Sequence, residues 1–394
     1  MADNNENKVL NVPPLRFPEF SGEWEKCKFG DIATGFDYGM NAAAKPFDGE
    51  NKYIRITDID EASSTYNDTD IVSPDGSLTD NYVVNDRDIL LARTGASTGK
   101  SYLYRKSDGK LYYAGFLIRA NVTEHNPYFV FSQLHTHRYW RWVSIMSARS
   151  GQPGINSQEY SSFPIFTTSL HEENKIASLL SRLDERIATQ NKIIEDLKKL
   201  KSAIVDRLYS STNGETYSFC QLFEVVNEKN KKLDYRNVLS ASQELGMIER
   251  SDINIDIKFE QESISGYKIV RKGDYVVHLR SFQGGFAFSD RTGICSPAYT
   301  ILRPNDLVGY GYLSHFFTSK LFIKSLKLVT YGIRDGRSIN VDEWLNMTVT
   351  LPNIQEQVRI LTIINAIDAK LHIEIKKQSC LFRQKSYLLN TMFI

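Results

Sequence analysis

The sequence lacks the features that mark several classes of protein. Its four cysteines are scattered and form no Cys-x-x-Cys pair, so neither disulfides nor a zinc site are expected. No apolar run reaches the ~18 residues that a membrane span needs, and the polar segment 1–11 contains no apolar signal region. The net charge is only +1, which excludes a uniformly basic nucleic-acid coat but leaves room for local basic patches. We therefore expect a cytoplasmic globular protein that contacts no membrane.

What the chain does contain is a long heptad pattern. From Ser169 to about Tyr209, apolar residues recur at alternating steps of four and three, without Pro or Gly. This spacing is typical of a coiled-coil helix, and Ser169-Leu-His-Glu172 predicts a capping box at its start. A helix of about 40 residues is roughly 60 Å long at ~1.5 Å per residue. That is too long for the core of a small domain, so the helix needs a partner.

The partner lies in the same chain, 184 residues later. A second capping signal begins at Asn353, and apolar residues from Ile360 to Met392 keep the same steps. The offset also holds upstream, where Ile155-Asn156 corresponds to Ile339-Asn340. An offset held without gaps over so many residues indicates an internal duplication.

The sequence thus predicts an α+β fold with an internal pseudo-two-fold duplication. Two mixed α/β domains are separated by two long helices that form an antiparallel coiled coil. Within the domains, Asn126-Pro127 predicts a helix that runs to about Ile145, and its counterpart is expected from about Tyr310 to Val329. The expected parts are an N-terminal strap 1–24, a first domain 25–168, a central helix 169–210, a second domain 211–352 and a C-terminal helix 353–394.

Polar residues within the heptads predict how the two helices align. In an antiparallel pair, a positions face d positions. Setting Lys201 against Glu374 also sets Gln190 against Lys385, whereas sliding the helices by one heptad sets Lys201 against Ile367. Because an unpaired buried charge is costly, we expect the first alignment.

No complete catalytic motif is present, and no cofactor is expected. The run from Gly95 to Ser101 has three residues between its glycines where a phosphate-binding loop has four, and an extended segment follows it instead of a helix. The run from Asn126 to Phe129 lacks the second proline of an amino-methyltransferase loop and predicts a helix cap. Two alternatives stay open at this point: a non-catalytic coiled-coil adaptor, and a nucleotide- or S-adenosylmethionine-dependent enzyme.

Cationic and amide side chains lie beside glycines and aromatic residues in both halves of the chain. Arg and Gln can make bidentate contacts to guanine and adenine edges, so these sets predict contact with double-stranded DNA. In the first half we expect the side chains of the Gly95 turn to be exposed at its tip. The predicted DNA-binding residues are Arg93, Thr94, Ser97, Thr98, Lys100, Arg149 and Gln152 in the first half, and Arg280, Ser281, Gln283, Tyr331, Arg334 and Arg337 in the second.

Several of these segments together resemble the specificity subunit of type I restriction–modification systems. They are Arg16-Phe-Pro-Glu-Phe20 with Trp24-Glu25, Leu90-Leu-Ala-Arg-Thr-Gly95, Gly151-Gln-Pro-Gly-Ile-Asn156 with Gly336-Arg-Ser-Ile-Asn340, and the helix pattern from Leu170 to Asp184 with its copy from Ile354 to Asp368. The resemblance covers nearly the whole chain. The second half has Arg280-Ser-Phe-Gln-Gly-Gly285 in place of the Thr-Gly turn.

The resemblance implies a subunit without activity of its own. Such a subunit has two target-recognition domains, selects a two-part DNA sequence, and assembles two S-adenosylmethionine-dependent methyltransferase subunits. It also assembles ATP-driven restriction subunits that translocate DNA.

Overall fold

The computed structural model describes residues 10–148, 152–242, 245–252, 261–278, 285–331 and 338–394. The chain forms two compact units. Unit 1 comprises Met1–Lys192 and Lys376–Ile394, and unit 2 comprises Ile193–Ile375. Among the helices that the structure describes, none is both long and apolar enough to cross a membrane.

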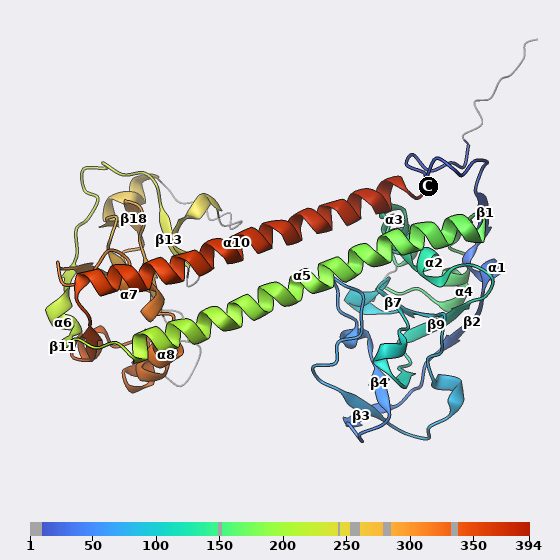
Figure 1. Ribbon diagram of the computed structural model, residues 1–394, viewed down its shortest axis with the longest axis horizontal. Helices are drawn as coiled ribbons and strands as arrows, with labels where there is room; N and C mark the ends of the chain where they lie inside the picture. The colour runs from blue at the N-terminus through green and yellow to red at the C-terminus, as the bar shows by residue number, and fades with distance from the viewer. Residues whose placement is uncertain (1–9, 149–151, 243–244, 253–260, 279–284, 332–337) are drawn as a thin grey trace, which may run out of the picture. The chain divides into compact units, whose positions relative to one another are not determined.

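Unit 1 contains a mixed α/β domain built around a four-stranded antiparallel sheet in the order β2-β9-β6-β7. Its hydrophobic core contains residues of this sheet, of α2 and of the first turns of α5. Helix α2 lies against the sheet and against α5 (Figure 1). The elements are β1 (Glu25–Lys28), α1 (Phe29–Ile32), β2 (Ala33–Tyr38), β3 (Ala43–Pro46), β4 (Lys52–Ile54), β5 (Val72–Asp75), β6 (Asp88–Ala92), β7 (Ser101–Leu103), β8 (Leu111–Tyr113), β9 (Leu117–Val122), α2 (Pro127–Gln133), α3 (His137–Met146), α4 (Ser157–Ser161) and β10 (Pro164–Thr167).

The helix expected from Asn126 to Ile145 is two helices. Its start is as predicted, because Asn126 Oδ1 accepts hydrogen bonds from the backbone of Tyr128 at 2.9 Å and of Phe129 at 3.0 Å. It ends early because the buried amide of Gln133 bonds the backbone of Phe166, donating at 2.7 Å and accepting at 3.0 Å. Thr136 then caps α3 by accepting from Tyr139 N at 3.3 Å. The contact between Gln133 and Phe166 is tertiary and leaves no local sequence signal.

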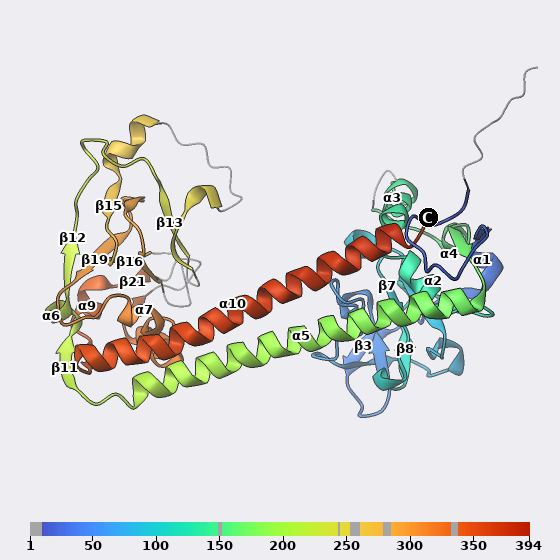
Figure 2. The ribbon, with the colours of Figure 1, turned by 45° about the horizontal axis from the view of Figure 1, so that its top comes forward.

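Unit 2 repeats this plan, with a sheet in the order β12-β19-β16-β17 (Figure 2). The expected helix 310–329 is again divided, because Ser319 Oγ accepts from Phe322 N at 3.2 Å and starts a new helix. The elements are β11 (Glu215–Ser218), α6 (Phe219–Leu222), β12 (Phe223–Val226), β13 (Leu239–Ser242), β14 (Gly246–Glu249), β15 (Lys268–Val270), β16 (Tyr275–Val277), β17 (Phe286–Phe288), β18 (Gly293–Cys295), β19 (Thr300–Pro304), α7 (Tyr312–Phe316), α8 (Lys320–Ser325), the 3-10 helix η7 (Leu326–Leu328), β20 (Thr330–Tyr331), β21 (Ser338–Ile339), α9 (Val341–Leu345) and β22 (Thr348–Leu351).

The two units share more than their sheet order. In each, a two-stranded ribbon (β1 with β10, β11 with β22) pairs a strand before the sheet strands with one after them, and a short helix capped by asparagine precedes the last strand. Asn156 caps α4 and Asn340 caps α9, and the large side chains of Tyr160 and Trp344 are buried at the equivalent positions. The predicted duplication is therefore confirmed by topology as well as by sequence.

Both long helices are present, as α5 (Leu170–Ser210) and α10 (Ile354–Thr391). In unit 1, Lys385 Nζ lies 2.6 Å from Asp184 Oδ1, and Gln378 Nε2 donates to Asn191 Oδ1 at 2.7 Å. Residue numbers rise along one helix as they fall along the other, so the two segments are antiparallel. Unit 2 contains the repeat-equivalent ion pair, with Lys201 Nζ 2.5 Å from Asp368 Oδ1.

The predicted alignment of the two helices is wrong. Lys201 pairs with Asp368 instead of Glu374, and Lys385 pairs with Asp184 instead of Gln190, so each partner lies six residues before the predicted one. Glu374 forms an ion pair with Lys370 on its own helix, at 2.6 Å.

The error has a physical reason. The prediction treats a lysine opposite an apolar layer as an unpaired charge. Its long aliphatic side chain instead lets the ammonium group reach the edge of the layer. There an aspartate follows the apolar residue in sequence, Asp368 after Ile367 and Asp184 after Leu183. The α/β domains add to both pairs: the Tyr128 hydroxyl donates to Asp184 in unit 1, and His315 Nε2 lies 3.8 Å from Asp368 in unit 2.

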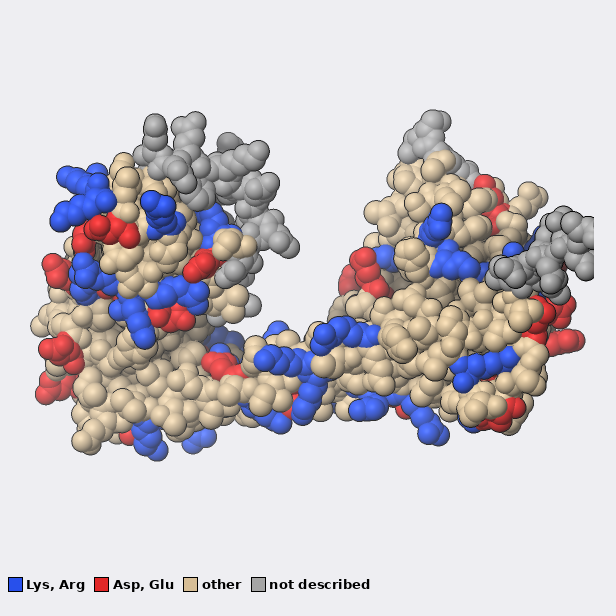
Figure 3. Space-filling model, turned by 90° about the horizontal axis from the view of Figure 1, so that it is seen from above, with Lys and Arg blue, Asp and Glu red and all other residues tan. Residues whose placement is uncertain are grey.

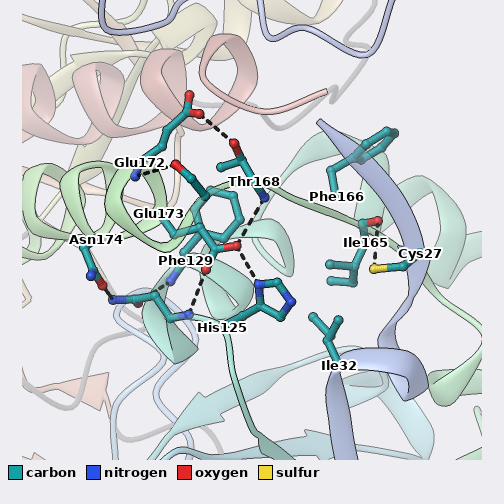
Figure 4. Close-up of polar contacts among 12 residues, drawn as sticks. Cys27, Ile32, His125, Phe129, Ile165, Phe166, Thr168, Glu172, Glu173 and Asn174 are labelled. Atoms are coloured by element: carbon teal, nitrogen blue, oxygen red, sulfur yellow. Dashed lines mark hydrogen bonds and ion pairs between the residues drawn. The ribbon is translucent and has the colours of Figure 1, made fainter. Parts of the chain in front are cut away.

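Helix α5 begins in a polar cluster that also holds the N-terminal strap. Glu172 accepts from Arg16 Nε at 2.7 Å, from Trp24 Nε1 at 3.3 Å and from Thr168 Oγ1 at 2.7 Å. Figure 4 shows Glu173 turned toward a different set of partners, the His125 ring, the Asn126 backbone N–H and the Thr168 backbone N–H. The expected capping box is therefore half formed. The Ser169 hydroxyl accepts from Glu172 N at 3.3 Å, but the Glu172 carboxylate accepts from Arg16 and Trp24 of the strap.

Candidate nucleic-acid interface

The Gly95 turn connects β6 to β7 in unit 1. Gly95 and Gly99 have φ angles of +68° and +93°, a region that side chains with a Cβ rarely adopt. The turn is docked on the segment before α4: Gly95 N donates to Pro153 O at 3.0 Å, and Ile155 N donates to Arg93 O at 2.9 Å. The structure therefore brings together two predicted sets that lie some fifty residues apart in sequence, the Gly95 turn and the segment that contains Gln152.

The side chains of the turn are less exposed than the sequence suggested. Thr98 is buried, and its hydroxyl donates to Gly95 O at 2.8 Å, so it closes the turn and is not available at the tip. Arg93, Thr94, Ser97 and Lys100 are half-buried. The ammonium of Lys100 lies 3.3 Å from Glu61 Oε2. Gln152, in contrast, is exposed.

Arg93 is held over an aromatic ring. Its guanidinium carbon lies 4.7 Å from the centre of the Tyr38 ring, and its Nη1 donates to Gly115 O at 3.3 Å. The Tyr38 hydroxyl accepts in turn from Ser157 N at 3.3 Å. Among the residues that the structure describes, no carboxylate pairs with this guanidinium, so the stacking positions it while leaving its positive charge available to a ligand.

A cavity of about 640 Å³ opens beside Arg93. It is lined by side chains from β2, β4 and the turns after β6 and β8, including Tyr38, Tyr53, Arg55, Arg93 and Phe116. Phe116 is 58% exposed. Sequence reasoning missed Tyr38 and Phe116, because strand pairing brings them to Arg93 and no local motif marks them.

Several predicted residues of the second half lie outside the described residues, as does Arg149 of the first half. They are Arg280, Ser281, Gln283, Arg334 and Arg337. The backbone of Tyr331 is described and pairs with Ser338 between β20 and β21.

Charges of both signs are mixed over the surface. Figure 3 shows Lys and Arg side chains interspersed with Asp and Glu on the face that it displays. In the part of the chain that the structure describes, no group of three His, Cys, Asp or Glu residues is arranged to hold a metal ion. Among the described residues of the predicted sets, the Gly95 turn and its flanks carry two cations, Arg93 and Lys100.

Comparison with known proteins decides the family. The model for the type I restriction modification DNA specificity domain matches the chain twice, over residues 21–199 and 214–380. The chain belongs to this family. It carries two copies of the DNA specificity domain and is a type I specificity subunit, a non-catalytic component of a restriction–modification complex. The alternatives of an adaptor and of an independent enzyme are set aside on this basis.

Three relatives of this specificity subunit align over nearly its whole length at low sequence identity. The type I restriction enzyme MjaVIII specificity subunit of Methanocaldococcus jannaschii is 23% identical over 422 residues, covering 98% of this chain and 95% of the relative. Among solved structures, the type I restriction–modification S subunit from M. genitalium aligns with a TM-score of 0.58 and 15% identity over 97% of this chain and 99% of that chain. A chain from a structure of a type I R-M system aligns with a TM-score of 0.59 and 14% identity over 96% of this chain and 99% of that chain. At these identities the structural likeness concerns the fold.

Proposed function

We propose that this specificity subunit recognises a two-part DNA target, one half-site with each α/β domain, and acts in the cytoplasm on double-stranded DNA. The domains are taken as residues 25–168 and 211–352, with the strap 1–24 and the helices 169–210 and 353–394 as the frame. The observation that carries the proposal is the duplicated sheet, in the same strand order in both units, combined with different sequences at the predicted contact segments. The same scaffold holding different side chains is what two distinct half-sites require.

In the first domain, the proposed DNA contacts are Arg93, Thr94, Ser97, Lys100, Arg149 and Gln152. In the second they are Arg280, Ser281, Gln283, Tyr331, Arg334 and Arg337. Thr98 is not among the proposed DNA contacts, because its hydroxyl donates a hydrogen bond to Gly95 O inside the turn. Arg93 is the first choice for base contact in unit 1, because stacking on Tyr38 pre-positions a planar donor that matches a guanine edge.

We further propose that the subunit assembles two methyltransferase subunits, together with restriction subunits that translocate DNA. The repeat supports this number, because the ion pairs Lys201–Asp368 and Lys385–Asp184 occupy equivalent positions and each adjoins its own α/β domain. A duplicated scaffold offers the same docking surface twice.

The division of labour predicts no methyl transfer by the purified chain. Together with its methyltransferase partner it should methylate DNA and bind its target, with log Kd rising against log salt by about 0.9 per phosphate contact. Incorporation of labelled methyl groups into DNA, measured with and without the partner, tests the first point, and titrations at several salt concentrations test the second. Methyl transfer by the chain alone would show that the non-catalytic assignment is wrong.

Exchanging one domain should change one half-site. Replacing residues 25–168 with the corresponding domain of another family member should give a new first half-site in the methylated motif and leave the second half-site and the gap intact. The methylome of a host that carries the chimera with the methyltransferase subunit is the measurement. The reciprocal exchange of 211–352 is the matched control, and a chimera that alters both half-sites together would contradict one-domain, one-half-site recognition.

A further inference from the structure

One side of α3 is exposed and cationic. Tyr139 and Val143 pack into the core of unit 1, while His137, Trp140, Arg141, Ser144 and Ile145 face solvent. Ile145 is 66% exposed. No Asp or Glu occurs anywhere in residues 126–158. The exposed side of α3 therefore combines positive charge with apolar surface and carries no acidic group of its own.

Arg138 does not contribute to this exposed side. Its guanidinium carbon lies 4.7 Å from the centre of the Phe166 ring, and burial lowers its pKa to about 10. The two arginines of α3 thus have separate roles. Arg138 packs inside the domain, and Arg141 extends from it.

The equivalent helix of unit 2 has the same character. Helix α8 with η7 presents Lys320, Leu321, Lys324, Lys327 and Leu328 to solvent, and Leu328 is 76% exposed. No Asp or Glu occurs in residues 307–334. Lys324 lies five residues after the cap Ser319, as Arg141 lies five residues after the cap Thr136. The duplicated domains have diverged in sequence here, yet a cation and a large exposed aliphatic residue recur at the same positions.

Helix α3 is continuous with the candidate interface. The Tyr139 hydroxyl donates to Gly99 O at 2.8 Å, and a Cβ at Gly99 would lie 2.8 Å from Val143 Cγ1 and 3.0 Å from the Trp140 ring. The Gly95 turn and α3 are thus packed together without space between them. Trp140, on the exposed side of α3, thus lies against the turn, and Arg141 follows it along the helix.

We propose that α3 and α8 each bind the sugar–phosphate backbone of the DNA that the adjoining domain recognises, with Arg141 and Lys324 as the phosphate contacts. The proposal rests on the function proposed above and adds a sequence-independent element to it. Ile145 and Leu328 lie one helical turn further along, where they can cover the apolar edge of the deoxyribose. A phosphodiester supplies the negative charge that the two helices themselves lack, although Asp206 of α5 accepts from Lys320 N at the start of α8, and it demands no base sequence.

The cavity beside Arg93 is another surface of this domain that a ligand could enter, but charge argues against a phosphate there. The segment 58–75 that follows its lining residue Thr57 contains six carboxylates and no Lys or Arg. Arg55 on the cavity wall is already bonded to Asp58, with 2.8 Å between Nη2 and Oδ1. Backbone contact is therefore placed on α3 at Arg141, beyond the start of the helix, where Ser64 Oγ of the acidic segment lies 2.9 Å from His135 Nε2.

The test uses the full chain assembled with its methyltransferase subunit, and two duplexes, one with the methylated motif and one with the same bases scrambled. Arg141→Ala and Lys324→Ala should each weaken binding to both duplexes by about tenfold at low salt and lower the salt slope by about 1, with the methylated motif unchanged. The matched controls are exposed lysines elsewhere, Lys45→Ala on β3, at the far end of the unit 1 domain from α3 (Figures 1 and 2), and Lys232→Ala in unit 2. These two control substitutions should change neither the affinity for the duplexes nor the salt slope.

The outcomes are separable. Variants that match their controls in affinity and in salt slope would overturn the proposal, and so would a change in the methylated motif. Loss of assembly with the methyltransferase subunit, measured by size-exclusion chromatography, would instead identify the surface as a protein-docking site and would also overturn it. Failure of the proposed function itself would show in the unmodified complex, as equal binding to the two duplexes.

Discussion

Replacing Glu172 by alanine should destabilise the start of α5 and release the N-terminal strap. Glu172 is 1% exposed, and it holds Arg16 through two hydrogen bonds of 2.7 Å, from Nε to Oε1 and from Nη2 to Oε2. Removing the carboxylate leaves a largely buried guanidinium without its counter-charge, and breaking such a pair costs about 3 kcal/mol. The donors of Trp24 and Thr168 lose their acceptor at the same time.

The repeat provides a matched control at the equivalent position of the second helix. Glu356 pairs with Arg359 on the same exposed helix surface, at 2.7 Å, and within the described part of the chain no strap residue is bonded to it. Glu356→Ala should therefore leave stability unchanged within error. Hydrogen exchange of segment 10–24 and of the first turns of α5, together with thermal unfolding of the full chain, measures the contrast. Equal behaviour of the two variants would show that the cluster contributes nothing beyond an ordinary surface pair.

The same cluster predicts an acid limit for strap binding. Burial opposes the ionisation of Glu172, but hydrogen bonds from Arg16, Thr168 and Trp24 outweigh it and hold the pKa of this carboxyl group below its usual 4.5. A group with a depressed pKa contributes stability that is complete above the ordinary value and is lost as pH falls through the folded value. The stability difference between the unmodified chain and the Glu172→Ala variant should therefore be constant at neutral pH and shrink below about pH 4.5.

Long-range regularity is what made the architecture predictable. The heptad steps and the 184-residue offset extend over many residues, so isolated exceptions do not obscure them. Helix starts were predictable for a different reason: the caps Asn126 and Asn353 act on backbone N–H groups within three residues, so the signal is local.

The failures share one cause, which is that tertiary contacts decide them. Gln133 ends a helix by bonding Phe166, more than thirty residues away. Thr98 turns inward because its hydroxyl, besides donating to Gly95 O, lies 3.4 Å from Pro153 O of a distant segment, and the neighbours of Arg93 come from separate strands. The prediction of the coiled-coil alignment was wrong because lysine side chains extend past the layer to which their Cα atoms belong. In each case the side chain had a partner that its sequence neighbours do not reveal.

Lengthening both long helices together should change the gap between the half-sites. Helices α5 and α10 each run through both units, and the pairs Asn191–Gln378 and Lys201–Asp368 fix their alignment. Inserting seven residues after Asn191 and seven after Lys377 adds one heptad to each helix and preserves both pairs. Seven residues add about 10 Å at ~1.5 Å per residue, which is about 3 base pairs at ~3.4 Å each. Binding to the original target should fall toward the non-specific level, by about 10³-fold or more.

Inserting the heptad into α5 alone is the informative control. This single insertion separates Lys201 from Asp368 or Asn191 from Gln378, because one alignment of the helices cannot satisfy both pairs. It should therefore abolish assembly with the methyltransferase subunits instead of changing the gap between the half-sites.

The paired insertion also weakens binding to the motif with the longer gap. Three base pairs rotate a half-site by about 100° around a duplex of ~10.5 base pairs per turn, whereas a heptad keeps the helix faces in phase. The lengthened protein should therefore methylate a motif with a longer gap but bind it less tightly than the unmodified protein binds its own. An unchanged gap in the methylome of the paired variant would show that the helices do not set the spacing.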